Sequence, residues 1–131
     1  MKIIYYSLTG NVKRFLKRTG CPHTIPLEKA MINGVNEPFI IVTGTIGFGQ
    51  VPDAVSHFLD KYQSSLVAVV ASGNRNWGQN FAKAGDIIST KYNVPLLMKF
   101  ELHGNARDVE LFKKKVDECY ENNRRETIQT Y

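Results

Sequence analysis

The fold of this chain is decided by residues 2–12, Lys-Ile-Ile-Tyr-Tyr-Ser-Leu-Thr-Gly-Asn-Val. The β-branched and aromatic residues from Ile3 to Tyr6 favour a strand that is buried on both faces. Small and hydroxyl-bearing residues then make a turn, and Val12, Phe15 and Leu16 recur at the spacing of a helix. A strand, a polar turn and a helix N-terminus predict an anion site, because free N–H groups and the helix dipole converge there. An ordinary N-capped turn is the alternative interpretation.

The length and composition bound the class of protein. The 131 residues suffice for one domain with a single core, which we place at residues 1–120. Apolar residues make up 43% and charged residues 22%, and no apolar run approaches the roughly 20 residues of a membrane-spanning helix. The chain enters a strand without the apolar segment of a secretory signal, so we expect a cytoplasmic protein. Residues 121–131 are polar and are predicted to form a frayed tail.

The formal net charge of +5 is concentrated on two predicted helices. The first helix carries Lys13, Arg14, Lys17 and Arg18, and the last carries the run 113–115. These residues lack interleaved aromatics and any nucleic-acid motif, so we expect an acidic protein partner or a solvated face, not nucleic acid. The two cysteines and three histidines are scattered, and they predict neither a disulfide framework nor a metal site.

Four further strands are predicted after the first. A short edge strand spans His23 to Ile25, and residues 27–37 are expected to form a loop or one helical turn. Two continuous apolar runs, at residues 39–42 and 66–71, predict buried central strands. Residues 96–102 predict the last strand. Apolar residues at helical spacing lie between these runs and after the last one, so strands and helices alternate along the chain.

This alternation predicts an α/β fold with a five-stranded parallel sheet and helices on both faces. The strand order that fits is 2-1-3-4-5, which brings the loops after the first, third and fourth strands to one rim. Those loops hold the unusual segments, residues 7–12, Thr43–Gln50 and Ser72–Gly78. Three glycines among residues 44–49 indicate close backbone approach or unusual φ angles. The sequence therefore predicts a ligand site at this rim.

The same loops exclude several kinds of phosphate site. The first loop has no GxxxxGK[ST] lysine, no GxGxxG pattern and no cysteine. These absences argue against a nucleoside triphosphate, a dinucleotide and a cysteine phosphatase. A phospho-receiver would need acidic residues at the ends of the first and third strands, where Tyr6 and Val42 stand.

A phosphomonoester held by neutral donors fits what remains, with a flat ring between two glycine-rich loops. That combination describes flavin mononucleotide (FMN). Phe48 and Trp77 offer ring faces, and Asn74 and Asn76 offer amides for the polar edge of the ring. The alternative is that both aromatic residues belong to the core, under mobile loops.

One segment of the chain resembles flavodoxins in general, and three others together resemble one family. The turn Ser7–Val12 resembles the phosphate loop of flavodoxins, although Val12 stands where a threonine is usual. Residues Thr43–Pro52, Ala71–Gly78 and Lys99–Leu102 together resemble the NrdI family, and the likeness extends to about residue 120. It implies a flavodoxin-like fold, an FMN cofactor and service to class Ib ribonucleotide reductase. In that family the flavin, reduced by an upstream flavin reductant, makes superoxide from dioxygen. The superoxide supports assembly of a dimanganese–tyrosyl radical cofactor in the reductase small subunit.

The resemblance also assigns binding roles to the three loops. The first loop would hold the phosphate, the second the N5 edge of the ring, and the third its opposite side and pyrimidine edge. The cofactor would carry the chemistry, and no catalytic residue or metal ligand is predicted. The cofactor-binding residues expected are Ser7, Leu8, Thr9, Gly10, Asn11 and Val12; Thr43, Gly44, Thr45, Ile46, Gly47, Phe48 and Gly49; and Ser72, Gly73, Asn74, Asn76, Trp77 and Gly78.

Two other functions are compatible with these residues. A general electron-transfer flavodoxin is typically acidic around its flavin, whereas residues 43–51 and 72–80 contain no Asp or Glu. Arg75 adds a positive charge there, and we expect it to stabilise a reduced, anionic flavin; the alternative is that Arg75 points to solvent and has no effect on the flavin. A flavin-free module that binds another phosphate ligand is the second alternative. The colour of the purified protein separates it from a flavoprotein.

Overall fold

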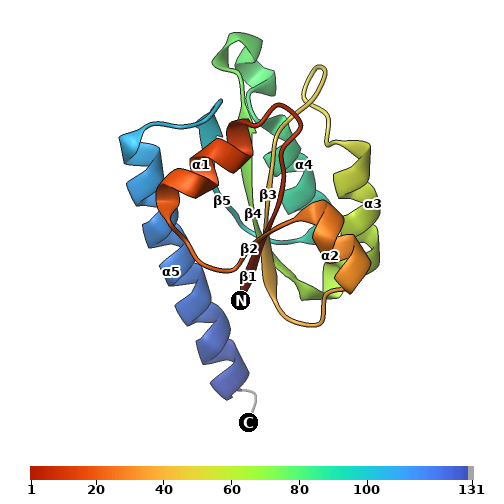
Figure 1. Cartoon of the computed structure of the whole chain (residues 1–131). Helices are drawn as coiled ribbons and strands as arrows, with labels where there is room; N and C mark the ends of the chain where they lie inside the picture. Colours follow the sequence, from red (N-terminus) through yellow and green to blue (C-terminus); the bar gives the residue numbers. More distant parts are fainter. Residues whose placement is uncertain (130–131) are drawn as a thin grey trace.

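The computed structural model describes residues 1–129, with side chains as far as residue 124. It has a five-stranded parallel sheet in the order β2-β1-β3-β4-β5, with helices on both faces (Figure 1), which confirms the predicted fold. The strands are β1 (Lys2–Tyr6), β2 (Thr24–Pro26), β3 (Phe39–Thr43), β4 (Leu66–Gly73) and β5 (Leu96–Glu101). The helices are α1 (Asn11–Thr19), α2 (Leu27–Asn33), α3 (Asp53–Tyr62), α4 (Lys83–Tyr92) and α5 (Ala106–Gln129), with short 3-10 helices η1 (Gln63–Ser65) and η2 (Arg75–Asn80).

The apolar runs of the sequence form the middle of the sheet. All five residues of β3 are buried, because β1 and β4 flank it and helices cover both faces. Ile41 of β3 is level with Ile4 of β1 and with Val69 of β4. The continuous β-branched runs are therefore explained by burial on both faces of a parallel sheet.

The two faces of the sheet have separate cores. On one face α1 and α5 pack together, and the Phe15 ring stacks on Phe100 at a centroid distance of 3.9 Å. Phe112 of α5 meets Phe15 edge-to-face. On the other face α2, α3 and α4 cover the sheet, with Phe58 among their buried residues (Figure 1). The five α-helices thus pack on the faces of the sheet and stabilise it. The loops at the strand ends lie outside these two cores and can form a binding site.

Three elements differ from the sequence prediction. Residues 27–33, expected as a loop or one turn, form helix α2. Leu27 and Ala30 lie on the side of this helix that faces the sheet, and their burial there stabilises it. The edge strand covers Thr24–Pro26, one residue later than expected. Helix α5 continues to Gln129 through most of the predicted tail, since no Gly or Pro interrupts it. Residues 130 and 131 lie outside the described residues.

None of the helices in the described part of the chain is long and apolar enough to cross a membrane.

Candidate functional site

A cleft lies at the carboxyl ends of the strands, where the predicted loops meet. Its walls come from the loops after β1, β3, β4 and β5. Among the residues that the structure describes, none that lines this cleft is charged. The lining residues are Tyr6, Ser7, Leu8, Thr9, Asn11, Val12, Gly44, Thr45, Ile46, Gly47, Pro52, Ser72, Gly73, Asn74, Trp77, Asn80, Ala82 and Leu102.

Most of the residues expected at the site from sequence line this cleft. Six expected residues do not: Gly10, Thr43, Phe48, Gly49, Asn76 and Gly78. Most of these shape the loops, as the following paragraphs describe. The three predicted loops thus build most of the cleft, with side chains from only part of each, and the loop after β5 adds Leu102.

The β1–α1 loop turns through Gly10, whose φ is +88°. Two polar side chains of this loop are already engaged, because Ser7 Oγ accepts the N–H of Lys13 at 3.2 Å and Asn11 Oδ1 accepts the guanidinium of Arg14. Val12, which stands in place of the usual threonine, is buried. The loop therefore offers mainly the free N–H groups of the first turn of α1, which suit an anion.

The β3–α3 loop closes on itself. The N–H of Ile46 donates to the Gln50 carbonyl at 3.0 Å, and the Gln50 N–H donates back at 2.7 Å. Gly49 is buried in this turn with a φ of +111°. A Cβ atom there would lie 3.1 Å from Lys83 Cβ and 3.2 Å from Asn80 Cβ. The glycine is needed both for its backbone angle and for the close packing of this loop on the start of α4.

Thr45 of the same loop has a buried hydroxyl without a hydrogen-bond partner among the described residues. It lines the cleft, whereas the neighbouring Thr43 is fully buried and donates to the Gly44 carbonyl at 2.9 Å. A buried hydroxyl without a partner costs about 1–3 kcal/mol, so native proteins rarely leave one. Because Thr45 itself lines the cleft, a change of its side-chain rotamer would bring the hydroxyl to the polar edge of a bound molecule. The donor set of the cleft therefore fits a neutral-edged ring with a phosphate, as FMN has.

The loop after β4 begins with a turn made by Asn74. Its Oδ1 accepts the N–H of Asn76 at 2.9 Å, which leaves the amide nitrogen as a donor on a residue that lines the cleft. The ring of Trp77 meets that of Phe48 edge-to-face, with centroids 5.3 Å apart. Phe48 is 75% exposed and does not line the cleft, so it supports Trp77 at the rim and is not itself a wall. Neither aromatic residue belongs to the core.

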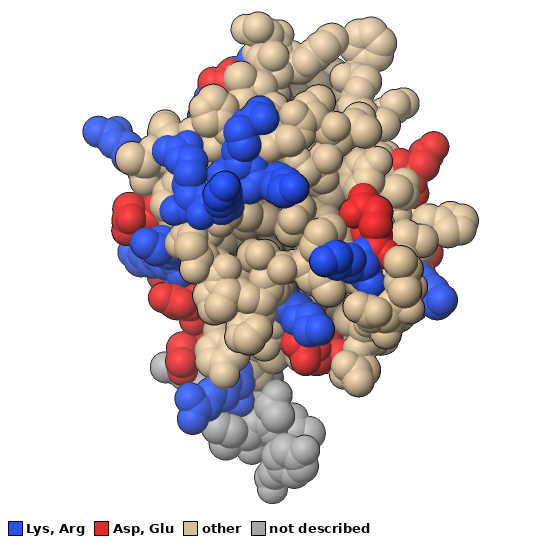
Figure 2. Space-filling view, in the orientation of Figure 1, with Lys and Arg blue, Asp and Glu red and all other residues tan. Residues whose placement is uncertain are grey.

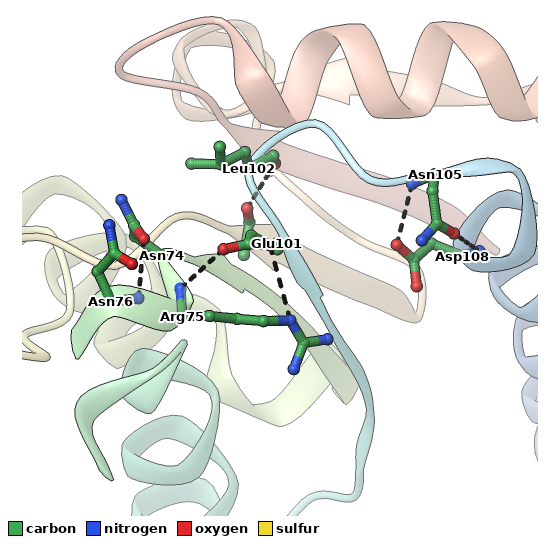
Figure 3. Close-up of polar contacts among 8 residues, drawn as sticks. Asn74, Arg75, Asn76, Glu101, Leu102, Asn105 and Asp108 are labelled. Carbon is green, nitrogen blue, oxygen red and sulfur yellow. Dashed lines mark hydrogen bonds and ion pairs between the residues drawn. The ribbon is translucent and has the colours of Figure 1, made fainter. Parts of the chain in front are cut away.

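Arg75 lies beside Glu101 (Figure 3) and does not line the cleft, so its expected effect on a reduced flavin stays a prediction. Its Nε lies 3.7 Å from Glu101 Oε1, and its guanidinium stacks over the ring of Phe81 at 4.7 Å. The sequence argument considered only the charges within the loops, and Glu101 comes from the end of β5. The positive charge of Arg75 is therefore balanced by a carboxylate 26 residues away.

Five lining residues were missed by the sequence analysis: Tyr6, Pro52, Asn80, Ala82 and Leu102. Tyr6 and Leu102 stand at strand ends on the predicted rim, and this position is the signal that could have identified them. Asn80 and Ala82 reach the cleft only because η2 folds the chain back before α4 begins. No local pattern indicates that path.

The basic residues of α1 form a patch beside the site. Figure 2 shows Lys and Arg side chains gathered over this helix. Two of the four are engaged: Arg14 donates to Asn11 within the same helix, and Arg18 donates to the Gly104 carbonyl before α5 at 2.9 Å. Lys13 and Lys17 are exposed. Two arginines of this patch thus bond to the protein itself, and the two lysines remain exposed to solvent.

A second hollow, between α3 and α4, has a charged edge. There the hydroxyl of Tyr92 donates to Asp60 Oδ1 at 2.6 Å, and Lys91 lies 3.2 Å from the same oxygen. The hydrogen bond from Tyr92, followed by that from Lys91, lowers the pKa of the exposed Asp60 carboxyl below its ordinary value. This charged cluster contrasts with the uncharged cleft.

Comparison with known proteins agrees with this architecture. A family model described as "NrdI Flavodoxin like" matches residues 3–114. The curated Protein NrdI of Macrococcus caseolyticus (strain JCSC5402) is 62% identical over 131 residues and covers 100% of both chains. Oxidised flavodoxin 1 from Bacillus cereus has a TM-score of 0.64 at 20% identity, covering 87% of this chain and 92% of its own. A short-chain flavodoxin associated with a bacterial microcompartment has a TM-score of 0.68 at 17% identity, covering 92% and 96%. The two structures show the fold alone.

Proposed function

Because the chain belongs to the NrdI flavodoxin-like family, we propose that residues 1–120 form an FMN-binding domain that serves class Ib ribonucleotide reductase. The observation that carries the cofactor assignment is the unpartnered hydroxyl of Thr45 in a cleft without charged walls. The β1–α1 loop would hold the phosphate with backbone N–H groups. Thr45 and Asn74 would meet the polar edges of the ring, and Trp77 would cover part of it.

The reaction proposed for this site is a transfer of electrons to dioxygen. Bound FMN, once reduced by an upstream flavin reductant, supplies superoxide for assembly of the dimanganese–tyrosyl radical cofactor in the reductase small subunit. The protein's part is to bind the cofactor, to orient its ring and to control access of water and oxygen. Membership of the family supports this assignment, and we place the protein in the cytoplasm with its partner.

Reconstitution with FMN tests the cofactor assignment. The purified protein, incubated with FMN and passed over a desalting column, should keep a yellow flavin spectrum at one FMN per chain. A colourless protein after this treatment would favour the flavin-free binding module.

The partner assignment needs a separate experiment. The reduced protein is mixed with a manganese-loaded class Ib small subunit under dioxygen, and the tyrosyl radical is measured by electron paramagnetic resonance. We expect a radical yield well above that obtained with a reduced general flavodoxin as the matched control. Equal yields from the two proteins would favour the general electron-transfer function.

A further inference from the structure

The end of β5 is joined by three hydrogen bonds to the end of β4 and to the loop that follows it. Leu102 N–H donates to the Gly73 carbonyl at 2.9 Å, and the Ser72 hydroxyl donates to the Leu102 carbonyl at 2.7 Å. One residue earlier, Glu101 Oε2 accepts the backbone N–H of Arg75 at 3.1 Å (Figure 3). Residues 101 and 102 are therefore bonded both to the end of β4 and to the loop that helps to form the cleft.

This fastening keeps Leu102 in an unfavourable backbone conformation. Its φ is +52°, a left-handed angle that residues other than glycine rarely adopt. Such a conformation persists only where surrounding contacts enforce it, and it is found most often at functional sites. Leu102 also lines the cleft, so the strained residue and the bonds that hold it belong to the site.

Glu101 makes two contacts with Arg75, and they differ in strength. The ion pair spans 3.7 Å between side chains that are 65% and 39% exposed, so solvent screens it and it contributes little. The hydrogen bond from the Arg75 N–H to the carboxylate is shorter and charge-assisted, which makes it the stronger of the two. The carboxylate thus acts mainly on the backbone of the loop.

We infer that Glu101 is a positioning residue of the cofactor site. Its carboxylate fixes the start of η2, and through it the two cleft residues Asn74 and Trp77 on either side of Arg75. The inference rests on the proposed FMN site, but the position of the loop can be measured without flavin. Trp77 is the only tryptophan in the chain, so its fluorescence reports on this loop alone.

Four variants separate the backbone contact from the ion pair. Glu101→Ala removes the acceptor, whereas Glu101→Gln keeps a side-chain oxygen of the same reach without the charge. Arg75→Pro removes the N–H donor, and Arg75→Ala removes the guanidinium but keeps the N–H. Proline is compatible with this position, because Arg75 begins a 3-10 helix and Asn74 before it is extended, with φ of −115° and ψ of 124°.

The flavin-free variants are first checked for folding by circular dichroism. We expect Glu101→Ala and Arg75→Pro to shift the Trp77 emission to longer wavelength and to increase its quenching by acrylamide. Their dissociation constants for FMN should rise about fivefold, as expected for one lost hydrogen bond. Arg75→Ala should match the wild type in both measurements. Glu101→Gln, whose neutral oxygen accepts a weaker hydrogen bond, should fall between the wild type and Glu101→Ala.

Two results would overturn the inference. Unchanged Trp77 emission and quenching in Glu101→Ala and Arg75→Pro would mean that Glu101 does not position the loop. A shift in Arg75→Ala as large as that in Glu101→Ala would mean that the ion pair holds the loop. If the variants show the expected Trp77 responses but the wild-type protein binds no FMN, the positioning role is supported and the proposed function is contradicted.

Discussion

The β1–α1 loop and the β3–α3 loop face the same cleft but offer different groups to a ligand. In the first, Ser7 Oγ accepts the Lys13 N–H and Asn11 Oδ1 accepts the Arg14 guanidinium, so the other backbone N–H groups of the turn and the Thr9 hydroxyl remain for a ligand. In the second, the backbone of Ile46 and Gln50 closes the turn, and the hydroxyl of Thr45 remains. The first loop thus presents mainly backbone N–H groups, and the second, whose backbone is closed on itself, presents a side-chain hydroxyl. Each arrangement suits a different part of the proposed cofactor.

The largest effect should come from the glycines that shape the two loops. Gly49→Ala should lower the free energy of unfolding by about 3 kcal/mol, because φ is +111° and the added Cβ meets Lys83 and Asn80. Gly10→Ala should cost only about 1–2 kcal/mol, since its left-handed angle is milder and the nearest atom is the flexible end of Arg14. Urea denaturation of the flavin-free protein measures both.

Gly44→Ala is the matched control for these substitutions. Its φ is not positive and a Cβ there would have no neighbour within 4 Å, so we expect the stability of the wild type. Equal losses in Gly49→Ala and Gly10→Ala would show that packing of the β3–α3 loop on α4 adds nothing to the cost of the backbone angle.

The hydroxyls of the two loops should have opposite effects on stability. Thr45→Val removes an unpartnered buried hydroxyl and should stabilise the flavin-free protein by about 1–2 kcal/mol. It should also weaken FMN binding by about 1 kcal/mol, because the hydroxyl would find its partner in the cofactor. Ser7→Ala should destabilise the flavin-free protein by about 1 kcal/mol, because the Lys13 N–H loses its acceptor.

Thermal unfolding with and without FMN gives both quantities for each variant. If Thr45→Val destabilises the flavin-free protein, the hydroxyl has a partner such as ordered water, and the contrast between the loops fails.

The sequence predicted the sheet well because the decisive signals are local. Continuous apolar runs identify β3 and β4, and glycine clusters identify the loops at their ends. Helix α2 was missed because seven residues give only two buried positions, Leu27 and Ala30, too few for a clear period. That helix is stabilised by its packing on β1 and β2, which the segment itself does not reveal.

The site was predicted as three loops but not as a set of contacts. Thr45 and Thr43 are two residues apart and chemically alike, yet one hydroxyl is satisfied by a neighbouring carbonyl and the other is not. Glu101 reaches Arg75 across 26 residues, through the pairing of β5 with β4. Such contacts depend on register and loop path, and neither leaves a pattern in the local sequence.

The exposed hydroxyl of Thr9 gives a smaller test of the β1–α1 loop. Thr9 lines the cleft and is exposed, so Thr9→Ala should leave the stability of the flavin-free protein unchanged. It should weaken FMN binding by about 1 kcal/mol if the hydroxyl adds one donor to the backbone N–H groups. Isothermal titration calorimetry with FMN and with riboflavin, which lacks the phosphate, measures the effect. A loss of equal size with riboflavin would place Thr9 at the ring and not at the phosphate.

The smallest effects on FMN affinity should come from the charged side chains near the cleft, Lys13 and Arg75. Lys13 is exposed in the first turn of α1, and its charge adds to the helix dipole at the proposed phosphate position. Lys13→Gln should therefore weaken FMN binding by about 0.5 kcal/mol at low salt, and this loss should vanish at high salt, where exposed charges are screened. Arg75→Gln, a matched loss of one positive charge, should leave FMN affinity unchanged at both salt concentrations, because Glu101 already balances Arg75. A salt-dependent loss in Arg75→Gln as large as that in Lys13→Gln would show that the guanidinium acts on the ligand despite its carboxylate partner.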